Sequence, residues 1–382
     1  MDISKESLDL HYKLKGKLEV KSRYNIKTKK DLALMYTPGV AEACKEIEKD
    51  YSKSFMLTRR ANLVAVVTDG TAVLGLGNIG PAAAMPVMEG KCALFKEFAD
   101  IDAIPICIDT NDVDKIVETI ALISKSFGGI NLEDIAAPRC FEVEKRLKEI
   151  CDIPVFHDDQ HGTAIVVAAA LINSLKATNR TKEQVNVVIN GAGAAGIAIA
   201  KLLLNVGFKN VTMCDINGIV CMGDNSLNEA QKEIAVYTNK ERKIGKLKDA
   251  LIGADIFIGV SKPNLVTREM IKTMNKPIVF ALANPVPEIM PEEALVGGAV
   301  IIGTGRSDLP NQINNVLAFP GIFKGALSVN AKEITEEMKI KAAYAIADMV
   351  DEVSLNKGIV VPDALNKEVA NNVAKAVASC CK

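Results

Sequence analysis

The chain has 382 residues, with 46 lysines and arginines against 47 aspartates and glutamates and a formal net charge of −1. This length predicts two or three domains, because single hydrophobic cores stop growing at about 250–300 residues. A hydrophobic content of 49% with 24% charged residues excludes a disordered chain. Near-neutral charge excludes a binder that relies on bulk electrostatics, so we expect no nucleic-acid partner.

The cysteines and apolar segments indicate the compartment. Nine cysteines are scattered along the chain without a CxxC pair, which is typical of reduced thiols in a cytoplasmic protein. The N-terminus lacks the apolar core of a signal peptide. The longest apolar stretch, 164–171, is too short to span a bilayer. We therefore expect a cytoplasmic protein with no membrane segment.

The first half of the chain predicts mixed helices and strands. Asp69 and Gly70 form a turn dipeptide between two apolar runs and predict a β-hairpin. Thr163 is the expected N-cap of a later helix. In chain order, we expect one or two short helices in 1–30, the hairpin over 62–76, a helix over 81–98, a strand at 103–108, a helix over 112–125, strands at 127–135 and 152–159 that end in carboxylates, and a helix over 163–175.

From Val185 onward, strands alternate with helices, which indicates a parallel sheet covered by helices. The tail from Ile334 predicts two helices with a joint near Pro362. The chain is therefore expected to be α/β, with an N-terminal α/β domain of residues 1–160 and a Rossmann-type domain of residues 161–382 whose C-terminal helices start at about 331. The strands of the second domain are expected at 186–190, 211–215, 254–260, 277–285 and 299–305.

Two stretches match the pattern G-x-G-x-x-G, at 75–80 and at 191–196. The second follows an apolar strand and precedes a helical pattern, and another strand ends in Asp215, 19 residues after the last glycine. These features form the dinucleotide fingerprint, in which a tight turn and a helix N-terminus meet the pyrophosphate. The residues of this candidate cofactor loop are Gly191, Ala192, Gly193, Ala194, Ala195 and Gly196.

The first glycine motif is expected to be a backbone turn that lines a cleft. It follows a predicted hairpin arm, and Pro81 and Pro86 interrupt the helix that should follow a dinucleotide loop. Asp215 bears on the cofactor, because a carboxylate accepts hydrogen bonds from the ribose 2′-OH of NAD and repels the 2′-phosphate of NADP. The next cationic residue is Lys232. NAD is favoured, and NADP stays open because a distant basic residue could fold back.

Two carboxylate doublets follow apolar strands: Glu133 with Asp134, and Asp158 with Asp159. The carboxyl ends of neighbouring parallel strands converge, so the four acids would repel one another without a cation or a base. An all-oxygen set suits Mg²⁺ or Mn²⁺ better than zinc. The alternative is a pair of helix N-caps with exposed acids.

His157 and His161 lie four residues apart, a spacing that would suit zinc on a helix. Gly162 and the acid doublet instead predict a change from strand to loop. We therefore expect both histidines to be structural and hydrogen-bonded.

Eight motifs follow one another along the chain: LMYTPGVAEAC, VVTDGTAVLGLGNIG, PVMEGKCALFK, GGINLEDI, FHDDQHGTA, NGAGAAG, FALANPVPE and TGRSDLPNQINNVLAFPG. In sequence and order they resemble the motifs of malic enzymes of the short bacterial type, over about residues 10–330. The resemblance implies oxidation of L-malate with NAD or NADP and decarboxylation to pyruvate and CO₂, with Mg²⁺ or Mn²⁺. It also implies decarboxylation of oxaloacetate.

The resemblance implies a role for individual residues. Tyr36 matches the catalytic tyrosine, Lys91 the catalytic lysine, and Asp158 the acid beside that lysine. To act as a base near neutral pH, Lys91 would need a pKa lowered from about 10.4 by burial and a nearby cation. Glu133, Asp134 and Asp159 match the metal ligands. The substrate-holding asparagines match Asn284, which also borders the cofactor, and Asn315, with Asn314 beside it.

One departure concerns the substrate carboxylate. Longer members of the family carry an arginine before LGLG, where this chain reads Thr71-Ala72-Val73. Arg306 and Arg139 are the alternatives. The resemblance further implies a homodimer or higher homo-oligomer, with Tyr36 serving its own or a neighbour's site.

Three other functions stay open at this point. The first is a malolactic conversion of malate to lactate. The second is a non-catalytic sensor of NAD or malate, and the third is a metal-dependent decarboxylase without net redox, which would leave the dinucleotide fingerprint unexplained.

Overall fold

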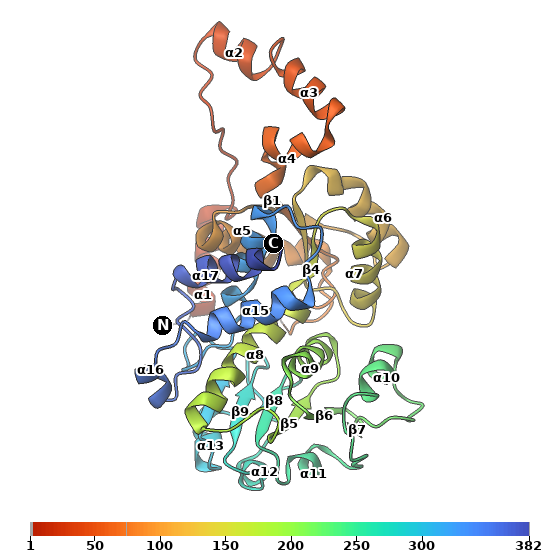
Figure 1. Ribbon diagram of the computed structural model, residues 1–382, viewed down its shortest axis with the longest axis vertical. Coiled ribbons are helices and arrows are strands. Elements are labelled where there is room, and N and C mark those ends of the chain that lie inside the picture. Colours follow the sequence, from red (N-terminus) through yellow and green to blue (C-terminus); the bar gives the residue numbers. More distant parts are fainter. Residues whose placement is uncertain (1–2, 74, 382) are drawn as a thin grey trace.

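The computed structural model describes residues 3–73 and 75–381, which form two parallel sheets with helices around them (Figure 1). The first sheet has the strand order β2-β1-β3-β4, with all neighbours parallel. Its strands and the helices between them are β1 (Leu63–Thr68), α5 (Gly80–Ala99), β2 (Asp102–Cys107), α6 (Val113–Ile123), η3 (Ser124–Ser126), β3 (Gly129–Leu132), α7 (Arg139–Ile150) and β4 (Val155–His157).

The hairpin prediction at Asp69 and Gly70 is wrong. β1 pairs in parallel with both β2 and β3, so it is a central strand rather than a hairpin arm. The second apolar run forms only an isolated bridge between Val73 and Gly77, and Leu74 lies outside the described residues. Gly70 has a φ of +72°, and a Cβ there would lie 2.4 Å from the backbone of Gly80. The glycine turn therefore brings the chain against the start of α5 instead of reversing a strand.

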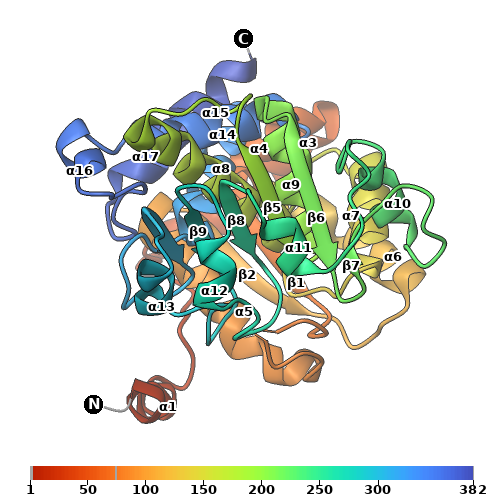
Figure 2. The ribbon, with the colours of Figure 1, turned by 90° about the horizontal axis from the view of Figure 1, so that it is seen from below.

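The second sheet confirms the predicted parallel arrangement. Its order is β10-β9-β8-β5-β6-β7, and β7 alone runs antiparallel to its neighbour. Figure 2 labels β9, β8, β5, β6 and β7 of this sheet. β8 and β9 are buried throughout, as strands covered by helices on both faces should be. The elements are β5 (Asn186–Asn190), α9 (Ala194–Val206), β6 (Asn210–Asp215), β7 (Gly218–Ile219), α10 (Glu229–Ala235), α11 (Leu247–Leu251), β8 (Ile256–Gly259), α12 (Arg268–Lys272), β9 (Ile278–Ala281), α13 (Pro291–Val296) and β10 (Ile301–Thr304).

Helix α8 (Asp158–Thr178) joins the two halves and packs against α9. It begins at Asp158, so the predicted start at Thr163 and the predicted loop at the acid doublet are wrong. Acidic residues in the first turn suit the positive end of a helix. The helix continues through Gly162. A Cβ at this position would lie 1.9 Å from Asp158 Oδ1. This glycine is needed for close packing around Asp158 rather than for a turn.

The C-terminal tail has one more helix than predicted and contacts both halves. α15 packs on α8 and α9, and α17 packs on α14 and α5. None of the helices in residues 3–73 and 75–381 is long and apolar enough to cross a membrane. The remaining C-terminal elements are η4 (Asn315–Leu317), α14 (Phe319–Ser328), α15 (Glu336–Ala347), α16 (Glu352–Asn356), α17 (Glu368–Ala378) and η5 (Ser379–Cys381).

The segment that connects α1 to β1 in the sequence forms an arm that projects from this body, with α2 and α3 at its far end (Figure 1). No residue of α2 or α3 is buried, although the arm carries large apolar side chains such as Leu34, which is 58% exposed. The elements before β1 are α1 (Ile3–Leu14), α2 (Lys29–Met35), α3 (Val40–Lys49), η1 (Tyr51–Lys53), α4 (Ser54–Leu57) and η2 (Arg59–Asn62).

Candidate active site

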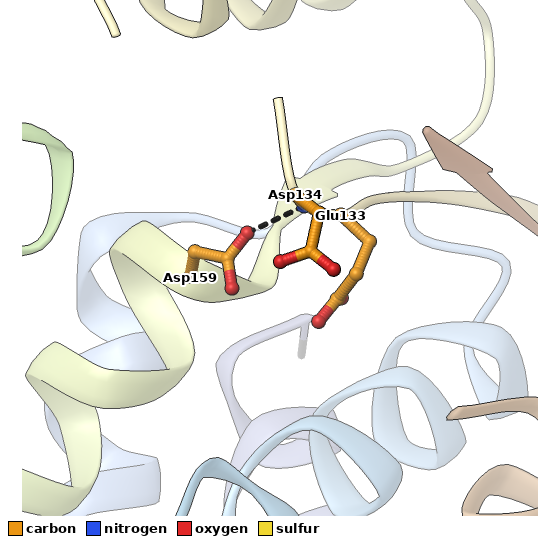
Figure 3. A group of neighbouring side chains, drawn as sticks. All are labelled: Glu133, Asp134 and Asp159. Atoms are coloured by element: carbon orange, nitrogen blue, oxygen red, sulfur yellow. Dashed lines mark hydrogen bonds between the residues drawn. The ribbon is translucent and has the colours of Figure 1, made fainter. Parts of the chain in front are cut away.

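The carboxyl ends of β3 and β4 bring the acidic side chains to one edge of the first sheet. Glu133 and Asp134 follow β3, and Asp158 and Asp159 begin α8 directly after β4. Carboxylate oxygens of Glu133, Asp134 and Asp159 lie within 4.8 Å of one another (Figure 3). We call these three residues the acidic trio. Asp158 instead contacts Lys91, so the predicted group of four divides into a trio and an acid–lysine pair.

Backbone geometry holds the acidic trio together. Asp134 has a left-handed φ of 54°, which a short polar residue tolerates, and its N–H donates to Asp159 Oδ2 at 2.7 Å. Asn131 Nδ2 donates to Glu133 Oε2 at 2.8 Å. Oδ2 of Asp134 is buried and has no hydrogen-bond partner among the described residues. An acceptor oxygen is therefore left for a cation.

Burial makes the ionised form of the trio unfavourable. Burial, followed by the charges of Asp159 and Glu133, raises the pKa of Asp134 to about 9. Burial also raises the pKa of Glu133 to about 7 and that of Asp159 to about 6. The trio offers three carboxylate ligands, and one oxygen of Asp134 has no hydrogen-bond partner among the described residues. This is the kind of ligand set that a hard divalent cation takes. The acidic trio thus fits Mg²⁺ or Mn²⁺, whose charge would hold all three groups ionised.

Lys91 is buried on α5 between two of the acids. Its Nζ lies 2.6 Å from Asp158 Oδ2, 2.8 Å from Glu133 Oε1 and 4.3 Å from the centre of the Phe319 ring. Burial alone would lower the pKa of Lys91, but the charges of Asp158 and Glu133 outweigh burial and raise it. The expected lowering of this pKa requires a bound cation, so it stays a prediction for the metal-bound protein. A divalent cation at the trio would oppose these charges.

Asp158 connects Lys91 to the second half of the molecule. It is fully buried, and burial raises its pKa to about 7. Asn315 Nδ2 donates to the same Oδ2 atom that contacts Lys91. An acid with a pKa near neutrality in contact with a lysine ammonium forms a pair that can hold and pass on a proton.

The other two asparagines take different positions. Asn314 caps η4, where its Oδ1 accepts from the Val316 N–H at 2.9 Å. The carbonyl oxygen of Asn284 lies 2.9 Å from the position that a Cβ of Gly75 would occupy. The first glycine motif therefore lies against the loop after β9.

The second glycine motif leads from β5 into α9. Gly191 has a φ of +119°, and a Cβ on Gly196 would lie 1.7 Å from the carbonyl oxygen of Gly191. A Cβ on Gly193 would meet no described heavy atom within 4 Å. Gly193 is also the N-cap of α9 and makes no side-chain cap. The loop thus combines a tight turn, open space and uncapped helix N–H groups, which suit a diphosphate.

Asp215 lies at the end of β6, as predicted. Its Oδ1 accepts hydrogen bonds from the N–H groups of Asn217 at 2.7 Å and Gly218 at 3.1 Å. Two backbone donors hold the carboxylate at the edge of the sheet, where the fingerprint places the ribose-binding acid.

Tyr36 lies apart from these residues. It directly follows α2 in the projecting arm and is 69% exposed (Figure 1). Of the two arginines considered for the substrate carboxylate, Arg306 pairs with Asp308, two residues further on. Arg139 Nη2 donates to Thr71 Oγ1 at 3.1 Å, so it lies beside the loop that lacks an arginine.

The histidines differ from one another. His161 Nε2 lies 2.7 Å from Glu144 Oε1, so this histidine is hydrogen-bonded as expected. His157 is fully buried, and neither ring nitrogen has a hydrogen-bond partner among the described residues. The expectation that His157 is hydrogen-bonded is therefore wrong. Burial lowers the pKa of His157 to about 4.

Two residues of the site were not expected from the sequence. Asn131 positions Glu133, and the ring of Phe319 lies against the Lys91 ammonium. Asn131 could have been found, because it is the one polar side chain in the otherwise apolar strand β3. Phe319 carries no such signal, since one more apolar residue in an apolar helix looks like core.

A buried lysine beside an acidic trio and a dinucleotide loop on a second sheet are the features of a metal-dependent dehydrogenase that uses a pyridine nucleotide. Comparison with protein families agrees: the malic enzyme N-terminal domain matches residues 15–148, and the malic enzyme NAD binding domain matches residues 160–382. The chain belongs to the malic enzyme family.

Several relatives are similar over almost the whole chain. The bifunctional malic/malolactic enzyme of Bacillus subtilis is 58% identical over 99% of this chain and 93% of its own length. The NAD-dependent malic enzyme of Geobacillus stearothermophilus is 54% identical over 95% of this chain and 76% of its own. The crystal structure of an NAD-dependent malic enzyme from Thermotoga maritima is 51% identical, covers 97% of this chain and 98% of that one, and superposes with a TM-score of 0.94.

Proposed function

We propose that this protein oxidises L-malate and decarboxylates the product to pyruvate and CO₂, with NAD as the hydride acceptor and Mg²⁺ or Mn²⁺ at the acidic trio. The observation that carries the proposal is the contact of Lys91 with Asp158 and Glu133, at the edge of the trio. This arrangement provides a proton acceptor next to a cation site, and both are needed to oxidise a 2-hydroxy acid. A bound cation would supply Lewis-acid polarisation of the substrate's C2 oxygen.

Lys91 takes the C2 hydroxyl proton as C2 loses its hydride to NAD, and Asp158 receives the proton from Lys91. After CO₂ leaves, Asp158 returns the proton to Lys91, which protonates the oxygen of the enolate. Tyr36 then donates a proton to C3 while Lys91 removes the enol proton, and Lys91 passes that proton to Tyr36, so that all three side chains regain their starting protonation states. The proton taken at C2 balances the proton gained at C3, so malate and NAD⁺ yield pyruvate, CO₂ and NADH.

A lysine variant tests this proposal. Lys91→Met is expected to lower malate-dependent NADH formation by at least about 100-fold. Lys96→Met on the same helix is the matched control, because Lys96 pairs only with surface acids of the described chain. Undiminished turnover in Lys91→Met would overturn the proposed role of Lys91. A variant that has lost turnover but keeps its full biological effect would instead revive the alternative of a non-catalytic sensor.

Tyr36 is proposed to act in the site of a partner subunit of a homodimer. The tyrosine is 69% exposed, in an arm where the large apolar side chains of Leu32 and Leu34 are 50% and 58% exposed. A symmetric exchange of arms would bury these side chains and complete both sites at once.

Asp215 supports a preference for NAD over NADP, and the ratio of kcat/KM for the two cofactors tests it.

The Bacillus subtilis relative favours one second candidate, a malolactic reaction in which pyruvate is reduced to lactate before release. Lactate without net NADH would identify it.

We also expect a cytoplasmic location, since all nine cysteines are unpaired.

A further inference from the structure

A groove of about 710 Å³ lies between the first half of the chain and the dinucleotide-binding half. Its walls are α7, α8, α9, α10 and α15. Among the described residues, none of the acidic trio, Lys91, the cofactor loop or Asp215 lines it. The groove is therefore separate from the proposed site, although α8 and α9 take part in both. Its volume is in the range that holds a small molecule.

The floor of the groove is apolar and well packed. Ala164, Ile197 and Leu202 line it and are at most 2% exposed. Ile234 and the half-exposed ring of Tyr237 add an apolar wall from α10 and the residues after it. A ring-sized apolar body could lie on this surface without displacing a side chain.

Cations outnumber anions along the walls. Lys148, Lys201 and Lys339 each pair with a glutamate of the groove, at 2.6, 3.0 and 2.6 Å respectively. Lys145 also lines the groove, is exposed, and makes no ion pair with a described residue. The remaining positive charge favours an anionic group.

Two buried polar side chains of the groove wall, Lys339 and Gln160, have donors that are not all satisfied by the described residues. Lys339 is 3% exposed, with its Nζ 3.1 Å from His161 Nδ1 and 2.6 Å from Glu336 Oε1. Glu336 is the one carboxylate that pairs with this ammonium among the described residues, and the Glu336 side chain is half exposed. Gln160 is 4% exposed, and its Nε2 has no hydrogen-bond partner among the described residues. An ammonium has three N–H donors and Lys339 has two acceptors here, so an anion in the groove would take the third donor.

We propose that this groove binds a small amphipathic anion, namely a ring-sized apolar body that carries a carboxylate, sulfonate or phosphate, with its charge near Lys145 and Lys339. The site does not depend on the proposed reaction. It lies against α8, which begins with Asp158 and Asp159, and against α9, which begins at the cofactor loop. Its occupant would therefore contact both helices that support the proposed site.

The probe is 8-anilinonaphthalene-1-sulfonate, whose fluorescence is titrated against the full chain with saturating NAD and Mg²⁺. One saturable site per chain is expected. Lys145→Glu should raise its Kd about fivefold, the effect of about 1 kcal/mol from a surface charge. Ala230→Trp fills the groove from α10 and should raise the Kd at least about tenfold. Lys248→Glu, an equally exposed lysine on α11, is the matched control and should leave the Kd unchanged.

Unfolding temperatures of the variants show whether each is folded, and Lys145→Glu keeps the test valid if Ala230→Trp is not. The proposal is overturned if the Kd is the same in both variants and the control. It is also overturned if probe bound to the NAD-free protein is displaced when NAD is added. A groove covered by a second copy of the chain would show no saturable site, which also overturns it.

Discussion

Replacing Asp134 with asparagine is expected to stabilise the metal-free protein at pH 8 and to remove its response to Mg²⁺. Burial raises the pKa of Asp134 to about 9 in the folded chain, against an ordinary value of 3.8. The folded chain therefore holds a proton that the unfolded chain releases, so stability falls as the pH rises from the ordinary value toward the raised one. Asparagine has no such proton, and the decline from this residue disappears.

The size of the effect follows from the shift. One group with a raised pKa lowers the free energy of unfolding by about 1.4 kcal/mol per pH unit within that window. Between about pH 5 and pH 8, one such group lowers the free energy of unfolding by about 4 kcal/mol. Glu133 and Asp159, with pKa values of about 7 and about 6, steepen the lower part of the decline. Mg²⁺ at 100 times its Kd would restore about 2.7 kcal/mol.

The assay is unfolding followed by circular dichroism at several pH values, in a chelator and in excess Mg²⁺. Asp9→Asn is the matched control, because Asp9 is exposed on α1. The reasoning is refuted if metal-free wild type is equally stable at pH 5 and pH 8. It is also refuted if Mg²⁺ stabilises Asp134→Asn as much as wild type.

Three other predictions concern the cofactor, the arm and the start of α8. Asp215→Ala should lower the NAD-to-NADP ratio of kcat/KM about tenfold, or about 1.4 kcal/mol; an unchanged ratio in steady-state kinetics would contradict the role of this carboxylate. Tyr36→Phe and Lys91→Met should each be nearly inactive. When subunits of the two variants are mixed through reversible dissociation, about a quarter of wild-type activity should return, because half of the dimers contain one intact site. No recovery would place Tyr36 in its own subunit's site. Gly162→Ala should lower kcat at least about 100-fold by displacing Asp158, whereas unchanged kcat would show that Asp158 tolerates the move.

The sequence predicted the elements whose signals are local. The strands and helices of the second sheet, the cofactor loop and Asp215 follow from hydrophobic pattern and glycine spacing over short distances. The acidic doublets were expected to meet because parallel strands end at one edge. This reasoning brought Glu133, Asp134 and Asp159 together correctly.

The failures came where distant contacts override a local signal. Asp69-Gly70 reads as a hairpin turn, but β1 lies between two parallel partners that the local pattern does not indicate. Gly162 reads as a helix breaker, although packing against Asp158 requires a glycine within α8. The raised pKa of Lys91 could not be predicted either, since it depends on three acids from elsewhere in the chain.

The most direct test of the proposed reaction is its stoichiometry. L-malate, NAD and Mn²⁺ are incubated with the protein, and NADH at 340 nm and pyruvate are measured in the same sample. We predict equal amounts of NADH and pyruvate, with neither formed after chelation of the metal. Malate consumption that yields lactate without NADH, or turnover that persists without metal, would contradict it.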